Sequence, residues 1–333
     1  MAKPGFAAVY GHKDIIAHMK KAVQTGRVSH AYLLAGEKGS GKKMLAGLFA
    51  AALLCESDRN EPCGRCLSCR KAKDGNHPDI IWVKHEKPEL IKIDEIRDQV
   101  VGTVDIKPYE SRFKIYIIPD ADKMNPQAQN AFLKTIEEPP SYAVIMLLAD
   151  NPDALLETVR SRCVRLDLRA VPDAEVKEYL TEELHCSAGE AALLAAFGQG
   201  NIGRARAAAR DEVFREMLDT AIRLMKSIHD MPVVEIVTTV KILAEQKERI
   251  YDFLDILLLW FRDVLLYKAT RDLDGLIFRN EASEIRRESS ACSYEGLEEI
   301  LSSIEKAKTR LRANVNFELA VELLTLTIRD NLS

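Results

Sequence analysis

The stretch AYLLAGEKGSGKKMLAGLFAAALL, residues 31–54, decides the fold class. It begins with a short apolar run typical of a buried strand, continues through a glycine-rich loop, and ends in an alanine- and leucine-rich segment that favours a helix. Strand, glycine-rich loop and helix in this order form the context in which a GxxxxGK motif binds phosphate groups. We therefore predict an α/β domain built around a phosphate-binding loop.

Four more apolar runs follow this stretch: DIIWV, FKIYII, AVIMLL and CVRLDL, the last ending at residue 168. Segments with helical spacing separate them, which is typical of a parallel sheet buried on both faces. Between the second and third of these runs, Asn125 can cap a helix, Pro126 fits its first turn, and Pro139 with Pro140 stops it. Ala128, Phe132 and Ile136 would then share one helical face.

Strand-like runs are absent after residue 168, and helical spacing continues to the end of the sequence. The glycine-rich break FGQGNIGRARAAAR, residues 197–210, separates a short helical unit from a longer one. We predict three domains: an α/β domain over residues 1–169, a helical unit over 170–210 and an all-helical domain over 211–333. In the last, Trp260 and Phe261 lie on a ridge that we interpret as core, with subunit contact as the second interpretation.

The composition limits the classes of function. The 333 residues include 47 basic and 51 acidic side chains, a formal charge of −4, so the whole chain offers no positive field for DNA and should bind it weakly alone. No stretch approaches about 18 uninterrupted apolar residues, and the amino terminus lacks the apolar core of a signal peptide. We expect a cytoplasmic protein without a membrane partner.

The glycines of the loop suit a phosphate cradle. Gly36, Gly39 and Gly41 would let backbone N–H groups turn toward phosphate oxygens. Lys42 would supply a positive charge at the β and γ phosphates of a nucleotide.

The residues that should hold magnesium are missing. Lys43 stands where a Ser or Thr hydroxyl would bind the metal, and its charge would repel it. At the end of the run FKIYII, Pro119 occupies the place of the metal-binding Asp, and Asp120 that of the water-activating Glu. We expect no ATP hydrolysis by this chain, and an inert turn or occasional nucleotide binding is favoured over catalysis.

Four of the seven cysteines crowd into residues 55–69: Cys55, Cys63, Cys66 and Cys69. Four thiolates at this spacing can close tetrahedrally on zinc and leave no position for water, which predicts a structural metal site in an insertion of the α/β domain. His77 is not needed as a ligand, and we assign it a turn-forming or capping role before Pro78.

The motifs SHAYLLAGEKGSGKK, CGRCLSC, NHPD, NAFLKTIEEPP and ETVRSRC, in this order and spacing, resemble the delta-prime family of bacterial DNA polymerase III clamp-loader subunits. The resemblance covers Tyr10 to about Arg206. It implies an AAA+ P-loop-type module, with residues 170–210 as its lid, and a carboxyl-terminal collar over 211–333. It also implies a five-membered ring with gamma/tau motor subunits and a delta subunit, which opens a sliding clamp onto primed DNA.

The resemblance also assigns roles to two arginines. Arg162 matches the arginine that projects into the ATP site of an adjacent motor subunit, where a guanidinium stabilises the charge on the transferred phosphoryl group. The alternative is a surface arginine paired with a carboxylate. Arg204 matches a nucleotide-sensing arginine, with a helix-surface role as an equal alternative. We predict that Cys163 is a buried core thiol without chemistry.

Two other functions remain open at this stage. The first is an active ATP-hydrolysing motor of the same group, against which Lys43 and Pro119 argue. The second is a zinc-containing DNA-binding module, for which Arg65, Arg70 and Lys71 supply some basic surface. Any nucleotidyl transfer would belong to the DNA-directed DNA polymerase holoenzyme that the chain joins.

Overall fold

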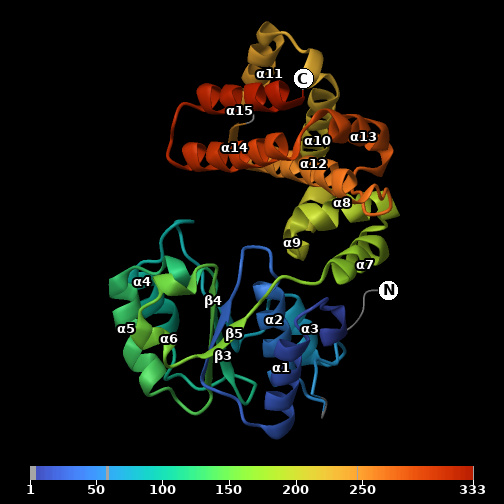
Figure 1. Cartoon of the computed structure of the whole chain (residues 1–333). Helices are drawn as coiled ribbons and strands as arrows, with labels where there is room; N and C mark the ends of the chain where they lie inside the picture. Colours follow the sequence, from blue (N-terminus) through green and yellow to red (C-terminus); the bar gives the residue numbers. More distant parts are fainter. Residues whose placement is uncertain (1–4, 58–59, 246, 333) are drawn as a thin grey trace. The chain divides into compact units, whose positions relative to one another are not determined.

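The computed structural model describes residues 5–57, 60–245 and 247–332 (Figure 1). The chain divides into two compact units. The first comprises Met1–Tyr179 together with Gly200–Gly203, and the second comprises Leu180–Gln199 together with Arg204–Ser333. The first unit is α/β and the second is helical.

A five-stranded parallel sheet forms the centre of the first unit, with the strand order β2-β3-β4-β1-β5. The strands are β1 (Ala31–Ala35), β2 (Ile80–Trp82), β3 (Lys114–Ile118), β4 (Ala143–Ala149) and β5 (Val164–Asp167). All five runs predicted as strands are confirmed. Because all five strands are parallel, the loop that follows β1 emerges at the carboxyl edge of the sheet, where open α/β sheets bind ligands.

Helices cover both faces of this sheet (Figure 1). They are α1 (Lys13–Thr25), α2 (Lys42–Leu53), α3 (Leu67–Lys73), α4 (Ile93–Ile96), α5 (Pro126–Glu137) and α6 (Glu157–Arg160). Side chains alternate along β1, so that Tyr32 and Leu34 join the core beneath α1 and α2. Leu33 joins the opposite core beneath α4, α5 and α6. The sheet is therefore buried on both faces, as its apolar runs predict.

Helix α5 begins and ends where the sequence predicts. The Asn125 side chain accepts a hydrogen bond from the Ala128 N–H at 2.7 Å, and Pro126 occupies the first turn. Phe132 and Ile136 are completely buried on the same face as Ala128. The helix ends at Glu137, two residues before the first of the two prolines.

The remaining helices follow β5, and the described residues of this segment contain no strand, as predicted. They are α7 (Asp173–Leu184), α8 (Ala188–Gly198), α9 (Ile202–Ala209), α10 (Glu212–Ser227), α11 (Val233–Glu245), α12 (Ile250–Thr270), α13 (Ala282–Ala291), α14 (Tyr294–Arg312) and α15 (Phe317–Leu332). Within the second unit, α12 packs against α8, α10, α13 and α14. Trp260 and Phe261 of α12 are buried, which confirms their interpretation as core. Among the described residues, no helix has the length and apolar character required to cross a membrane.

Candidate functional site

The phosphate loop connects β1 to α2. Gly39 and Gly41 adopt φ angles of 91° and 100°, a left-handed region that residues with a Cβ rarely enter. The Gly36 N–H donates to the Ala149 carbonyl at 3.1 Å, which ties the start of the loop to the end of β4. The Leu45 N–H donates to the Gly41 carbonyl at 2.9 Å and begins α2. The loop therefore has the strand-to-helix geometry that its sequence predicts.

The ammonium group of Lys42 is buried inside this loop. Its Nζ donates to the carbonyl oxygens of Gly36 at 2.5 Å and Glu37 at 2.8 Å. It also forms an ion pair with Asp150 Oδ1 at 2.7 Å. An ammonium has three N–H donors, and all three have partners here. Asp150, which follows the last residue of β4, was not among the predicted site residues.

Groups outside the loop contact the backbone carbonyl oxygens of its residues 38–40. The Asn201 side-chain amide donates to the Lys38 carbonyl at 2.8 Å, and the Gly203 N–H donates to the Gly39 carbonyl at 3.1 Å. His12 Nε2 lies 3.1 Å from the Ser40 carbonyl, and burial lowers the pKa of this imidazole. These three contacts were also not predicted, because each joins the loop to a segment distant in sequence.

The predicted magnesium position carries an ion pair between side chains. Lys43 Nζ lies 3.9 Å from Asp120 Oδ2, and His85 Nε2 lies 3.5 Å from the same oxygen. Pro119, directly after β3, is buried and has no side-chain oxygen. The structure thus brings Lys42, Lys43 and Asp120 together around the loop, and Lys43 supplies a cation in place of a hydroxyl ligand.

Arg162 lies in the short connection between α6 and β5. Its guanidinium donates to the Thr158 carbonyl at 2.8 Å and forms an ion pair with Glu137 Oε1 at 2.8 Å. Its side chain is 38% exposed, and that of Glu137 is 44% exposed. Two guanidinium nitrogens of Arg162, Nη1 and Nη2, are therefore engaged, and the side chain stays accessible to solvent.

Arg204 belongs to the second unit, and its contacts there are extensive. Its guanidinium lies over the Phe197 ring at 4.1 Å and forms ion pairs with Asp252, at 3.4 Å, and with Asp255. Both carboxylates belong to α12. Cys163, next to Arg162, is half-buried against the core beneath α5, and burial raises the pKa of its thiol to about 12.

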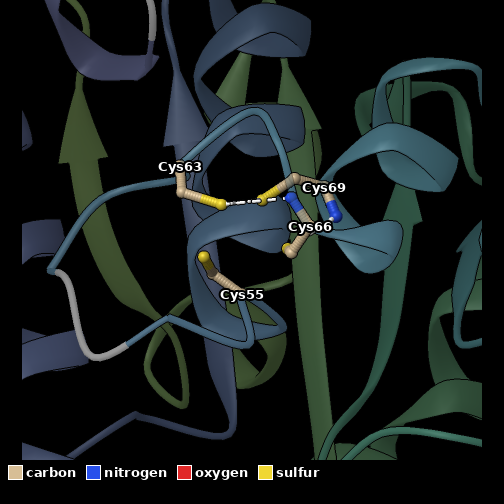
Figure 2. A group of neighbouring side chains, drawn as sticks. All are labelled: Cys55, Cys63, Cys66 and Cys69. Carbon is tan, nitrogen blue, oxygen red and sulfur yellow. Dashed lines mark hydrogen bonds between the residues drawn. The ribbon is translucent and has the colours of Figure 1, made fainter.

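The four predicted cysteines lie together in the first unit (Figure 2). Their sulfur atoms all lie within 4.8 Å of one another, and those of Cys63 and Cys69 are 3.9 Å apart. Two thiolates at about 2.3 Å from a tetrahedral zinc are about 3.8 Å apart, so this spacing fits a shared metal. The structure therefore forms a site able to hold a metal ion.

Backbone amides orient these sulfurs. The Arg65 and Cys66 N–H groups both donate to Cys63 Sγ at 3.4 Å, and these bonds lower the pKa of Cys63 to about 6. The Cys69 N–H donates to Cys66 Sγ at 3.4 Å, while burial raises the pKa of Cys69. N–H groups directed at sulfur favour the thiolate form, which is the form that binds metals.

His77 stands outside the cysteine cluster, as predicted, and braces it. Its Nδ1 accepts from the Asp79 N–H at 3.1 Å, and its Nε2 lies 3.0 Å from the hydroxyl of Ser68, which precedes a cysteine in α3. Burial lowers the pKa of the imidazole. The carboxylate of Asp79 accepts three backbone N–H groups, from residues 109–111. The sequence showed the NHPD motif but not this bracing role.

The comparisons with known proteins agree with these features. A family model described as "DNA polymerase III, delta subunit" matches residues 11–172, and one described as "DNA polymerase III, delta subunit, C terminal" matches residues 222–329. The DNA polymerase III subunit delta-prime of Bacillus subtilis is 30% identical over 93% of this chain and 93% of its own length. This chain belongs to the delta-prime family of DNA polymerase III. The membership confirms the resemblance and, with it, a clamp-loader role in replication.

Other members of the clamp-loader group match over different lengths. The tau subunit of Bacillus subtilis is 29% identical over 95% of this chain, which spans only 60% of that relative. The delta-prime subunit of Pseudomonas aeruginosa is 38% identical over 48% of this chain and 53% of its own length. Among solved structures, a DNA polymerase III gamma subunit-related protein of Thermotoga maritima has a TM-score of 0.42 at 20% identity, covering 96% of this chain and 99% of that one.

Proposed function

We propose that this delta-prime family chain is a non-hydrolysing subunit of the clamp-loader ring, and that it supplies Arg162 to the ATP site of a neighbouring motor subunit. The observation that carries the proposal is the contrast between two sites. In the phosphate loop, Lys42 is already paired with Asp150 from the end of β4, whereas the Arg162 side chain is partly exposed. The chain then takes part in ATP hydrolysis only by completing the site of another subunit.

The magnesium position supports the first half of this proposal. Phosphoryl transfer requires a metal ion that bridges the β and γ phosphates. Here Lys43 and Asp120 pair with each other, and Pro119 offers no ligand. Two of the usual metal contacts are therefore missing, which disfavours the alternative of an active motor ATPase.

Energetics support the second half. To act on a neighbouring site, Arg162 must leave Glu137, and an exposed ion pair of this kind contributes only about 0–1 kcal/mol. An arginine finger accelerates phosphoryl transfer by about 10³ to 10⁵. This factor corresponds to about 4–7 kcal/mol of transition-state stabilisation. The bond to the Thr158 carbonyl can persist and keep the arginine oriented. The cost of releasing Arg162 from Glu137 is thus small compared with the transition-state stabilisation that the guanidinium can supply.

For the cysteine cluster we propose a structural zinc held by Cys55, Cys63, Cys66 and Cys69. Cys55 follows α2, Cys63 and Cys66 precede α3, and Cys69 lies within α3. A four-thiolate site has no open position, so the metal would fix the insertion at residues 55–69 and would not act in catalysis.

The domain organisation and partners follow from the same proposal. Residues 1–169 would form the AAA+ P-loop-type domain, 170–210 the lid and 211–333 the collar that joins the gamma/tau motor subunits and the delta subunit. The sliding clamp and primed DNA would be reached through the complex. The ion pairs of Arg204 with Asp252 and Asp255 support a structural role for this arginine over nucleotide sensing.

Reconstitution tests the proposal. ATP hydrolysis is measured for the purified chain alone and after addition of motor and delta subunits, with clamp and primed DNA present in both cases. We expect no turnover by the chain alone and DNA-stimulated turnover in the mixture that depends on the chain. Turnover by the chain alone would establish it as a motor and contradict the proposal.

A further inference from the structure

We propose that Asp150 is an internal counter-ion of the phosphate loop: its carboxylate takes the place of a nucleotide phosphate at Lys42 and thereby excludes nucleoside di- and triphosphates from this loop. The inference rests on the proposed function, since it explains how a subunit that does not hydrolyse ATP keeps an intact glycine-rich loop. Asp150 would then determine whether the loop accepts an anion.

The first observation is the environment of Lys42. Its side chain is only 9% exposed, and a buried ammonium without an anion is costly. In a nucleotide-binding loop the bound phosphates supply that anion. Here the anion is Asp150, whose Oδ1 lies 2.7 Å from Nζ. Since the carbonyl oxygens of Gly36 and Glu37 take the other two N–H donors, no donor of Lys42 remains for phosphate.

The second observation is that the fold fixes Asp150 at this place. In the register of the sheet, Ala35 of β1 pairs with Ala149 of β4, so the residues that follow each strand emerge side by side. The Gly36 N–H bond to the Ala149 carbonyl continues that pairing into the loop. On its other side, the Asp150 N–H donates to Asp122 Oδ1 at 3.1 Å. The carboxylate is therefore positioned by backbone contacts.

The third observation concerns accessibility. The side chain of Asp150 is 38% exposed, so the carboxylate lies between Lys42 and solvent. An entering phosphate would meet a like charge at short range and would have to displace Asp150 from Lys42, its cationic partner. Replacement by Asn keeps the size and the acceptor oxygen but removes this charge.

Equilibrium binding of a fluorescent ATP analogue to the full chain tests the inference, with tripolyphosphate as a competitor and with or without magnesium. We expect Asp150→Asn to bind at least tenfold more tightly than the wild type, because an uncharged acceptor leaves Lys42 free to pair with phosphate. The matched control is Asp153→Asn, which removes an exposed carboxylate of the same segment that pairs with Arg160. It should bind like the wild type.

Two more variants complete the design. Adding Lys42→Met to Asp150→Asn should abolish the gain, and Asp150→Ser replaces the Asn variant should the latter not fold. Unchanged affinity in a folded Asp150 variant, or an equal gain in the Asp153 control, overturns the inference. Neither result affects the proposed function, which fails on a different readout, namely ATP turnover by the wild-type chain alone.

Discussion

Replacement of Glu288 by Gln should remove most of the pH dependence of unfolding of the second unit between about pH 5 and pH 8. Glu288 is 3% exposed, and burial raises the pKa of its carboxyl to about 8. Its Oε2 accepts from the Trp260 indole N–H at 2.7 Å, while its Oε1 has no hydrogen-bond partner among the described residues. The structure thus favours the protonated acid.

The sign and size follow from proton linkage. In the unfolded chain the carboxyl releases its proton near its ordinary pKa of 4.5, whereas the folded chain retains it up to about 8. Folding stability is therefore greatest below the lower value and falls as the pH rises through the upper one. At about 1.4 kcal/mol per pKa unit, a rise from 4.5 to about 8 corresponds to a loss of at most about 5 kcal/mol. A glutamine cannot ionise and avoids this loss.

Tryptophan fluorescence during urea unfolding provides the assay. The chain has two tryptophans, so a Trp82→Phe background leaves only Trp260, which contacts Glu288, as reporter. The urea midpoint should fall from pH 5 to pH 8.5 with Glu288 and stay nearly constant with Glu288→Gln. Exposed Glu298→Gln on α14 serves as the control and should behave like the wild type. Equal pH slopes with and without Glu288 would refute the reasoning.

Three further predictions concern the first unit and its proposed metal site. Cys69→Ser should lose bound zinc, measured by elemental analysis, and expose residues 55–69 to limited proteolysis, whereas Cys186→Ser should retain both properties; equal metal content would count against the site. Gly203→Ala should destabilise the chain by about 1–3 kcal/mol in urea unfolding, because its Cβ would lie 2.4 Å from a carbonyl oxygen of the phosphate loop, while Gly189→Ala has open space and should not. Asp79→Ala should cost about 1–3 kcal/mol in the same assay, since three partly buried backbone N–H groups lose their acceptor; an unchanged midpoint would exclude this bracing role.

The elements of the fold could be predicted because their signals are local. Each apolar run is short and bounded, and the Asn125 cap with Pro126 specifies the start of α5 within a few residues. The cysteine cluster is local as well, since Cys63, Cys66 and Cys69 follow one another at intervals of three residues. Such signals need no knowledge of distant segments.

The contacts of the phosphate loop and of Arg162 could not be predicted in this way, because their partners are distant in sequence. Asp150 is 108 positions from Lys42, and Asn201 is 163 positions from Lys38. Their proximity depends on the strand order, which places β1 beside β4, and on the return of the chain at α9. The pair of Glu137 with Arg162 likewise joins α5 to a different connection. Only the folded topology brings these side chains together.

The most direct test of the account is ATP hydrolysis by the assembled clamp loader that contains Arg162→Ala. The matched control is Arg160→Ala, two residues earlier, whose side chain pairs with Asp153. We predict that Arg162→Ala assembles normally but slows hydrolysis at the neighbouring site by about 10³-fold or more, while Arg160→Ala retains turnover. Unchanged DNA-stimulated turnover in the assembled Arg162→Ala complex would contradict the central claim.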